Sequence, residues 1–187
     1  MYRIFETAIL EWRSFDICLN FFDKSAMLMT RKDIRLHYIP LMVDNFKKCN
    51  NNIKMHILDI LVFVLIKIPD HHTRMKIHHF ANVDLAQSKS IFDRKIYIIF
   101  CSKVCAKISK KYFKEVFAFA MLKIIEEKKK DIAIVFMQNI IPIRKKLDDI
   151  SSTSKIENML NMFKNLFHKE TFIQAICQKA NNSITSS

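Results

Sequence analysis

Histidines are the side chains whose spacing in this sequence comes nearest to that of a metal site. They occur as two adjacent pairs, His71-His72 and His78-His79, and Asp70 precedes the first pair. Metal ligands on one helix are usually four residues apart, whereas these pairs start seven residues apart, which is roughly 10.5 Å along a helix axis. One ion cannot bind both pairs along a straight helix. We expect a solvated helix entry whose charge depends on pH, and no metal site.

The cysteines carry no sign of nucleophilic or redox chemistry. Cys101 and Cys105 share a helix face with apolar neighbours, so both thiols are expected to behave as small buried hydrophobic groups. No local signature of a catalytic cysteine surrounds any of the five. An odd, scattered set favours reduced thiols, and we expect a chain in the cytoplasm, with the nucleus as a second location. The five are Cys18, Cys49, Cys101, Cys105 and Cys177.

Other catalytic arrangements are missing from the sequence. Glu126-Glu127 and Asp148-Asp149 are adjacent acids close to lysines, which is typical of exposed helix ends rather than of an acid-base pair. The chain contains no glycine, which argues against phosphate-binding loops, dinucleotide fingerprints and nucleophile elbows. We expect a protein that is not an enzyme and that needs no cofactor.

The sequence is strongly basic, with 31 Lys and Arg against 18 Asp and Glu and a formal charge of +13. A stripe of lysines could follow phosphates and bind nucleic acid without sequence preference, at about 10⁻⁴ to 10⁻⁶ M at physiological salt. The alternative is a solvated face or a compositional bias, since Ile, Asn and Phe are also abundant. The basic runs are Lys107, Lys110, Lys111 and Lys114, then Lys128 to Lys130, and Arg144 to Lys146.

The composition predicts a folded, all-α chain. Of its 187 residues 50% are hydrophobic, and it has only 3 prolines and no glycine, which suits helices joined by short turns. The first residues lack the apolar core of a secretory signal, and the longest apolar run, 60–66, is far shorter than the ~20 residues that cross a bilayer. We expect no membrane partner. Apolar spacing predicts helices at 9–28, 31–49, 53–68, 74–84, 91–108, 111–128, 131–148, 155–168 and 171–180.

Several helix starts are marked by a hydroxyl residue followed by an acid three positions later. These capping pairs are Thr30 with Asp33, Ser90 with Asp93, and Ser154 with Glu157. The expected stops are Pro69, the asparagines at 50–52 and the segment 151–154. Pro40 and Pro142 fall inside expected helices, where a missing N–H should kink the helix or else end it.

The predicted helices repeat with a period near 40 residues, which is typical of HEAT and armadillo units. Two-residue elements at the start of every second helix are 41, 40, 39 and 40 residues apart, and the short turns force antiparallel neighbours. The sequence therefore predicts an α-solenoid of antiparallel helix pairs, a HEAT/armadillo-like superhelix. It has about five units over 1–180, the first of them partial, and a disordered tail at 181–187. The elements are Trp12-Arg13, Ile53-Lys54, Asp93-Arg94, Ile132-Ala133 and Phe172-Ile173.

Several of these elements resemble the second helices of HEAT repeats. They are Glu11-Trp12-Arg13, Asp93-Arg94 followed by Phe100-Cys101, and DIAIVFMQNIIPIRKKLD at 131–148. In order and spacing, over about residues 9–180, they are similar to the C-terminal repeats of the scaffold (A) subunit of protein phosphatase 2A. The regulatory subunits of protein phosphatase 4 are also similar. Ala133 and Ile173 replace the usual basic residue, and of the customary first-helix prolines only Pro40 remains.

The resemblance implies a partner-binding ridge. In that family the turns inside the repeats line the concave side and grip the catalytic subunit, and a Trp at the start of a second helix takes part. Trp12 matches this position, where a Trp would be a rigid anchor of the type enriched at hot spots, or else an inter-helix packing residue. The corresponding ridge comprises Trp12, Arg13, Asn52, Ile53, Lys54, Asp93, Arg94, Lys130 and Asp131.

The function that the resemblance implies is a non-catalytic scaffold or regulatory subunit of a serine/threonine protein phosphatase of the 2A type. Its partners would be the catalytic subunit and a further regulatory subunit. The alternative, which comes from the charge, is a basic HEAT-repeat module that binds nucleic acid or a ribonucleoprotein. Recovery of a phosphatase from a native lysate would support the first hypothesis, and nuclease-sensitive recovery without phosphatase the second.

Overall fold

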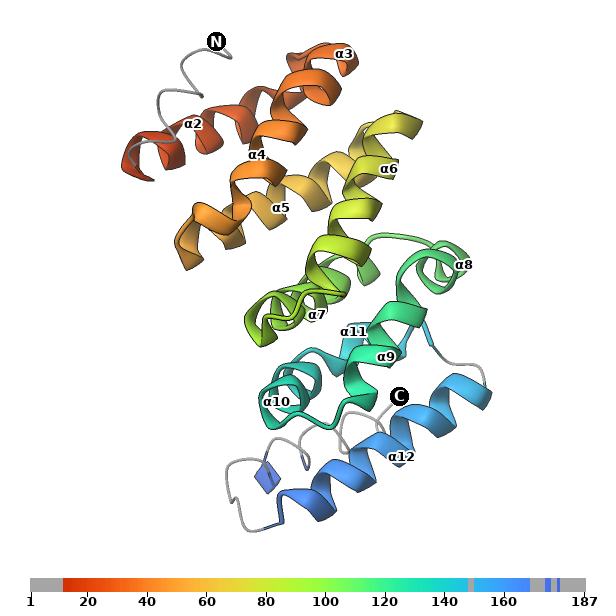
Figure 1. The fold of residues 1–187 in the computed structure, drawn as a ribbon. Helices are drawn as coiled ribbons and strands as arrows, with labels where there is room; N and C mark the ends of the chain where they lie inside the picture. The colour runs from red at the N-terminus through yellow and green to blue at the C-terminus, as the bar shows by residue number, and fades with distance from the viewer. Residues whose placement is uncertain (1–11, 148–149, 169–173, 176–177, 179–187) are drawn as a thin grey trace. The chain divides into compact units, whose positions relative to one another are not determined.

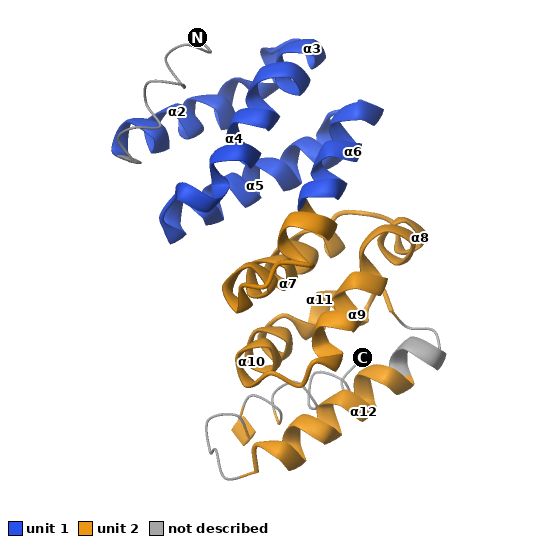
Figure 2. Ribbon diagram, in the orientation of Figure 1, with its two compact units in different colours: residues 1–80 blue, residues 81–187 orange. Residues whose placement is uncertain are grey.

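The computed structural model describes residues 12–147, 150–168, 174–175 and 178, and all regular structure in this part of the chain is helical (Figure 1). The prediction of an all-α fold is confirmed. The chain divides into two compact units, residues 1–80 and 81–187 (Figure 2). Each unit has its own buried apolar interior.

The first unit consists of helices joined by turns of a few residues. α2 (Trp12–Ser25) is followed by the 3-10 turn η1 (Ala26–Leu28). A continuous helical rod comes next, made of α3 (Arg31–Asp33), the π-helical turn η2 (Ile34–Tyr38), α4 (Ile39–Asn45) and the 3-10 turn η3 (Phe46–Lys48). The last helices of the unit are α5 (Asn51–Lys67) and α6 (His71–His79).

The chain enters the second unit through the π-helical turn η4 (Phe80–Leu85). α7 (Ile91–Cys105) follows, and then a second continuous rod made of α8 (Lys110–Phe113), the π-helical turn η5 (Lys114–Ala118) and α9 (Phe119–Glu126). The remaining helices are α10 (Lys130–Gln138), α11 (Ile140–Arg144) and α12 (Ile150–Leu166).

If each continuous rod is counted as one helix, every helix of a pair named below packs beside the helix after next in the same unit. In the first unit α2 packs against α5 and α4 against α6, and in the second α7 packs against α10. α2 and α5 run in the same direction (Figure 1). Asp16 Oδ1 and His56 Nδ1 are 2.9 Å apart across this contact, and the two residues are 40 positions apart in sequence. The two helices are therefore parallel and in register.

Alternate helices begin at nearly constant intervals along the chain. α5, α7 and α10 begin at residues 51, 91 and 130, which are 40 and 39 residues apart. α3, α6 and α8 begin at residues 31, 71 and 110, which are 40 and 39 residues apart. The predicted element at 172–173 lies outside the described residues.

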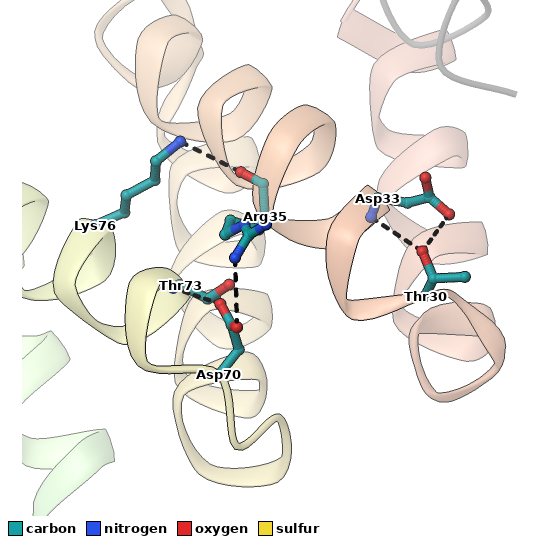
Figure 3. Close-up of polar contacts among 6 residues, drawn as sticks. All are labelled: Thr30, Asp33, Arg35, Asp70, Thr73 and Lys76. Carbon is teal, nitrogen blue, oxygen red and sulfur yellow. Dashed lines mark hydrogen bonds and ion pairs between the residues drawn. The ribbon is translucent and has the colours of Figure 1, made fainter.

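Two of the three predicted caps are confirmed. Thr30 Oγ1 accepts a hydrogen bond from the Asp33 amide at 3.1 Å and donates one to its carboxylate at 2.6 Å (Figure 3). Ser90 Oγ accepts from the Asp93 amide at 3.4 Å. The third cap is wrong, since Ser154 lies inside α12. The segment 151–154 continues the helix because Ser and Thr disfavour a helix interior only slightly.

Two helices begin earlier than their apolar spacing predicts. Asn50 and Asp70 cap α5 and α6 by accepting hydrogen bonds from the amides of Ile53 and Thr73, at 3.0 and 2.8 Å. Asn50 therefore begins a helix instead of ending one, and the helix predicted from residue 74 already starts at His71. In both cases a side-chain oxygen satisfies an amide that has no partner within the helix.

The predicted helix 131–148 is interrupted. Asn139, between α10 and α11, has φ −112° and ψ 8°, outside the helical region. Pro142 follows three residues later, and in a continuous helix it would leave the carbonyl of Gln138 without a donor and press its ring against that carbonyl. The break relieves both problems.

Pro40 lies within the rod of α3, η2 and α4 without ending it. The Ile39 amide donates to the Ile34 carbonyl, a π-type bond over five residues, so the next carbonyl, that of Arg35, would need a donor at position 40. Proline has no N–H. Lys76 Nζ, from α6, donates to the Arg35 carbonyl at 3.3 Å instead (Figure 3). The irregular turn thus precedes the proline, and a neighbouring helix completes its hydrogen bonding.

The π-helical turn η5, which contains no proline, is stabilised in a similar way. Asn82 Nδ2 donates to the Val116 carbonyl at 3.0 Å. The Tyr97 hydroxyl lies 2.9 Å from the Phe117 carbonyl and 2.8 Å from Asn82 Oδ1. Burial raises the pKa of Tyr97 well above its usual value, so the hydroxyl stays protonated and remains a donor. In both η2 and η5, side chains from other helices satisfy carbonyls of the wider turn.

In the turn between α9 and α10 a lysine occupies a backbone position that would suit glycine, and its cost to stability can be measured. Lys128 has φ 58°, in the left-handed region that glycine adopts most readily. We expect Lys128→Gly to raise the free energy of unfolding by about 0.5–1 kcal/mol, because relief of this backbone strain exceeds the added freedom of the unfolded chain. Urea denaturation measures the change.

Lys129→Gly is the matched control, because it removes the same charge from the next position. Lys129 is extended, with φ −80° and ψ 129°, which any residue adopts. This variant should lower the free energy of unfolding by about 0.5–1 kcal/mol. Equal effects of the two glycines would contradict the role of the left-handed backbone.

Candidate partner-binding surface

The predicted ridge residues lie at the amino-terminal turns of α2, α5, α7 and α10. Trp12 is the first described residue of α2, and its side chain is outside the described part of the chain. Arg13 follows it with an exposed side chain. These two residues and Asn52, Ile53 and Lys54 belong to the first unit, and Asp93, Arg94, Lys130 and Asp131 belong to the second.

In the first unit the structure corrects one ridge residue. Ile53 is only 2% exposed, so its side chain packs in the core and is not presented to a partner. It occupies the third position after the Asn50 cap, where α5 faces inward. Asn52 is exposed, and Lys54 is half-buried with Nζ 5.6 Å from the centre of the Phe46 ring, a cation–π contact. Asn52 stays exposed at this edge, whereas Lys54 packs its ammonium on Phe46.

In the second unit Asp93 is also corrected, for the same reason. It is the third residue after the Ser90 cap and is only 8% exposed. Its carboxylate accepts a hydrogen bond from the Ser88 hydroxyl at 2.7 Å, and the Ser90 amide donates to Ser88 Oγ at 3.1 Å. Asp93 therefore closes the turn before α7 and does not face a partner.

Arg94 links α7 to the end of α9. Its Nη1 lies 3.1 Å from Glu127 Oε2, and the two side chains are 14% and 34% exposed. The Arg94 Nε is buried and has no hydrogen-bond partner among the described residues. Beyond Glu127 the chain continues with Lys130 and Asp131, which are both exposed.

Arg94 and Glu127 line a groove of about 460 Å³ in the second unit. Phe119 lines this groove and is 80% exposed, which is unusual for a phenylalanine in a helix. Lys123 and Glu115 place charges of opposite sign beside it. The remaining lining residues are Asn82, Ala86, Gln87, Val116, Ala120 and Ile124.

Sequence reasoning missed this groove because segments far apart in the chain form it. Its walls come from 82–87 and 115–127, and Arg94 lies between them in sequence. One signal was present in the sequence. Phe117 and Phe119 are two positions apart, so one helix cannot bury both on the same face. One of the two rings had to face outward.

The histidine pairs do not converge on an ion-binding site. His71 and His72 are exposed, with ring centres 5.9 Å apart. Asp70 is committed to the α6 cap, and hydrogen bonding from Thr73, together with Arg35 at 3.8 Å, lowers its pKa (Figure 3). Within the described ranges no group of three or more His, Cys, Asp or Glu side chains could hold a metal.

His78 should make stability depend on pH. Burial lowers its pKa below the usual value near 6.5, and Arg74 and His71 lower it further. The folded state therefore favours neutral His78, so its contribution is complete above about pH 6.5 and decreases as the pH falls from there towards the lower folded pKa. We expect the melting temperature to fall over this window, and less so in His78→Gln. His79→Gln, at an exposed position, is the control and should keep the wild-type pH profile.

The thiols of Cys101 and Cys105 are buried, as the sequence predicts. Cys101 and Cys105 are both 0% exposed. Burial raises the pKa of Cys105 to about 12, against an opposing effect of the Lys146 ammonium, and also raises that of Cys101. Both stay protonated at neutral pH and are poor nucleophiles. Cys18 and Cys49 are free thiols, and Cys177 lies outside the described residues.

Comparison with known proteins gives no relative from which a function could be transferred. No family model matches the sequence, and neither a curated protein nor a solved structure matches the chain. A search of the described helices finds none that is long and apolar enough to span a bilayer.

Proposed function

We propose that this chain is a HEAT-like α-solenoid that binds a partner protein and catalyses no reaction itself. The observation that carries this proposal is the in-register packing of α2 on α5, with Asp16 and His56 in contact 40 residues apart. Parallel stacking of alternate helices, each one repeat from the next, is the packing expected of helical-repeat proteins. The 39- and 40-residue intervals between helix starts support the same interpretation.

The partner that we propose is the catalytic subunit of a serine/threonine protein phosphatase of the 2A type, in the cytoplasm or the nucleus. This choice rests on the resemblance of the ridge elements to HEAT second helices. The ridge is revised by removing the two buried residues, Ile53 and Asp93. A further regulatory subunit would be a second partner of such a scaffold.

In the second unit the groove beside Arg94 forms part of this proposed surface. It combines an exposed aromatic ring, Phe119, with charged groups at its rim, and aromatic and arginine side chains dominate binding hot spots. Lys130 and Asp131 follow closely in sequence after Glu127 of the groove wall. The groove and this edge can therefore contact one partner together.

A binding measurement with purified components tests the proposal. Immobilised full-length chain is exposed to phosphatase 2A catalytic subunit, and the dissociation constant is measured by biolayer interferometry. Phe119→Ala should weaken binding about 30-fold, the loss expected for a hot spot worth about 2 kcal/mol. Leu28→Ala, at an 89% exposed position in the first unit, should leave the constant unchanged.

Two outcomes would overturn different parts of the proposal. Absence of binding at micromolar catalytic subunit would reject the phosphatase as the partner. Binding that Phe119→Ala and Lys123→Glu leave unchanged would reject the groove as the contact surface. Trp12→Ala, tested in parallel, measures the contribution that the resemblance assigns to the first ridge position.

A further inference from the structure

The structure brings together two basic segments that are far apart in the sequence. Lys146 Nζ donates a hydrogen bond to the carbonyl of Ile108 at 2.7 Å, 38 residues away. This contact joins the end of α11 to the turn between α7 and α8, within the second unit. The Lys146 ammonium also affects the Cys105 thiol of the last α7 turn, which places it over the carboxyl end of that helix. The resulting basic cluster consists of Lys107, Lys110, Lys111, Lys145 and Lys146.

Two lysines of this cluster, Lys107 and Lys145, have no described ionic partner in the fold. Lys146 satisfies a carbonyl at the end of α7, which is the ordinary role of a lysine near a helix carboxyl end. Lys107 and Lys145 are exposed, and no described carboxylate pairs with either. Lys111 is 3.9 Å from Glu115, but the two side chains are 87% and 59% exposed, so this pair is weak. Arg144, next to the cluster, is paired with Glu157 at 3.8 Å and is not counted in it.

We propose that the basic cluster binds the phosphate backbone of duplex nucleic acid without reading its sequence. Several lysines gathered from two adjoining segments can neutralise adjacent phosphates and release their counterions. The cluster offers no aromatic platform for stacking unpaired bases, since Tyr112 is half-buried and its ring contacts Phe117 at 6.3 Å. The surface therefore fits a duplex backbone better than a single strand. It shares no residue with the groove, so this inference does not depend on the phosphatase proposal.

A salt titration with a matched variant tests the cluster. The full-length chain is titrated against a fluorescein-labelled duplex DNA of mixed sequence, by anisotropy, over a range of KCl concentrations. We expect a dissociation constant of about 10⁻⁴ to 10⁻⁶ M at physiological salt. The triple variant Lys107→Gln, Lys111→Gln and Lys145→Gln should bind at least tenfold more weakly. The plot of the logarithm of the association constant against the logarithm of salt concentration should also become less steep, its slope shrinking in magnitude by about 2–3. Each lost phosphate contact removes about 0.9 from that slope. Lys146 is left in place because it caps Ile108.

The control removes the same charge from the other basic run. Lys128→Gln, Lys129→Gln and Lys130→Gln lie on the turn between α9 and α10 and should change the affinity and the slope much less than the cluster variant. Equal losses in the two triple variants would overturn the proposal, because total charge and not the cluster would then govern binding. Competition by polyglutamate at the same charge concentration as duplex DNA would overturn it in favour of an acidic protein partner. Absence of duplex binding at low salt would reject it outright.

Discussion

Replacement of Phe117 by Ala should lower the free energy of unfolding by about 3–5 kcal/mol. Phe117 is 0% exposed, and its ring lies 5.8 Å from that of Phe100, 6.3 Å from that of Tyr112 and 6.2 Å from that of Phe113. Four rings meet there, one from α7 and three from the rod that contains α8 and η5, and neighbours held in such a cluster cannot collapse into the space that alanine leaves. Urea denaturation followed by circular dichroism gives the value.

Phe119→Ala is the matched control for this measurement. The same residue type is removed two positions away, but the Phe119 side chain is 80% exposed and therefore contributes little to the packing of the core. Its removal should change stability by no more than about 0.5 kcal/mol. Similar losses for both variants would contradict the inward orientation of Phe117 and the outward orientation of Phe119, and with it the groove.

The second large effect is expected from Tyr97→Phe, at about 1–3 kcal/mol of lost stability. The variant keeps the ring and removes only the hydroxyl, which lies 2.9 Å from the Phe117 carbonyl and 2.8 Å from Asn82 Oδ1. Tyr97 is 0% exposed, so water cannot replace the missing donor easily. The π-helical turn η5 then loses one of the side chains that satisfy its wider turn.

Tyr112→Phe provides the comparison for Tyr97→Phe. Tyr112 belongs to the same ring cluster but is only half-buried, so solvent can reach its end of the cluster. We expect a loss well below that of Tyr97→Phe. Amide hydrogen exchange along η5 adds an independent readout, since Tyr97→Phe should speed exchange there more than in α10. A stability loss for Tyr97→Phe no larger than that for Tyr112→Phe would show that η5 does not need the hydroxyl.

Features that depend on local sequence could be predicted without a structure. Helix faces follow from apolar spacing, and the caps at Thr30 and Ser90 follow from a hydroxyl and the amide three residues later. The cap at Asp70 does not fit the pattern of a hydroxyl residue followed by an acid, although its carboxylate accepts the same kind of amide hydrogen bond. The π-helical turns could not be foreseen, since Lys76, Asn82 and Tyr97 complete them from other helices.

In the candidate site, too, features set by local sequence could be predicted and features set by contacts between distant segments could not. The ridge positions could be placed at helix starts, yet Ile53 and Asp93 are buried because the third residue after each cap faces the core. A period in the sequence fixes where a turn lies but not which of its side chains point outward. The groove around Phe119 and the basic cluster around Ile108 both need contacts between distant segments, so only the folded chain reveals them. The phosphatase partner and the solenoid architecture remain predictions.

The contact between Asp16 and His56 has a consequence for how the chain folds. Like the Lys76 to Arg35 and Lys146 to Ile108 contacts, it joins positions about one predicted repeat length apart, with separations of 40, 41 and 38 residues. The entropy of loop closure grows only with the logarithm of loop length, and contacts of short sequence separation form early. Nucleation at one helix pair can therefore spread to the next, and a damaging substitution should be felt mainly by its immediate neighbours.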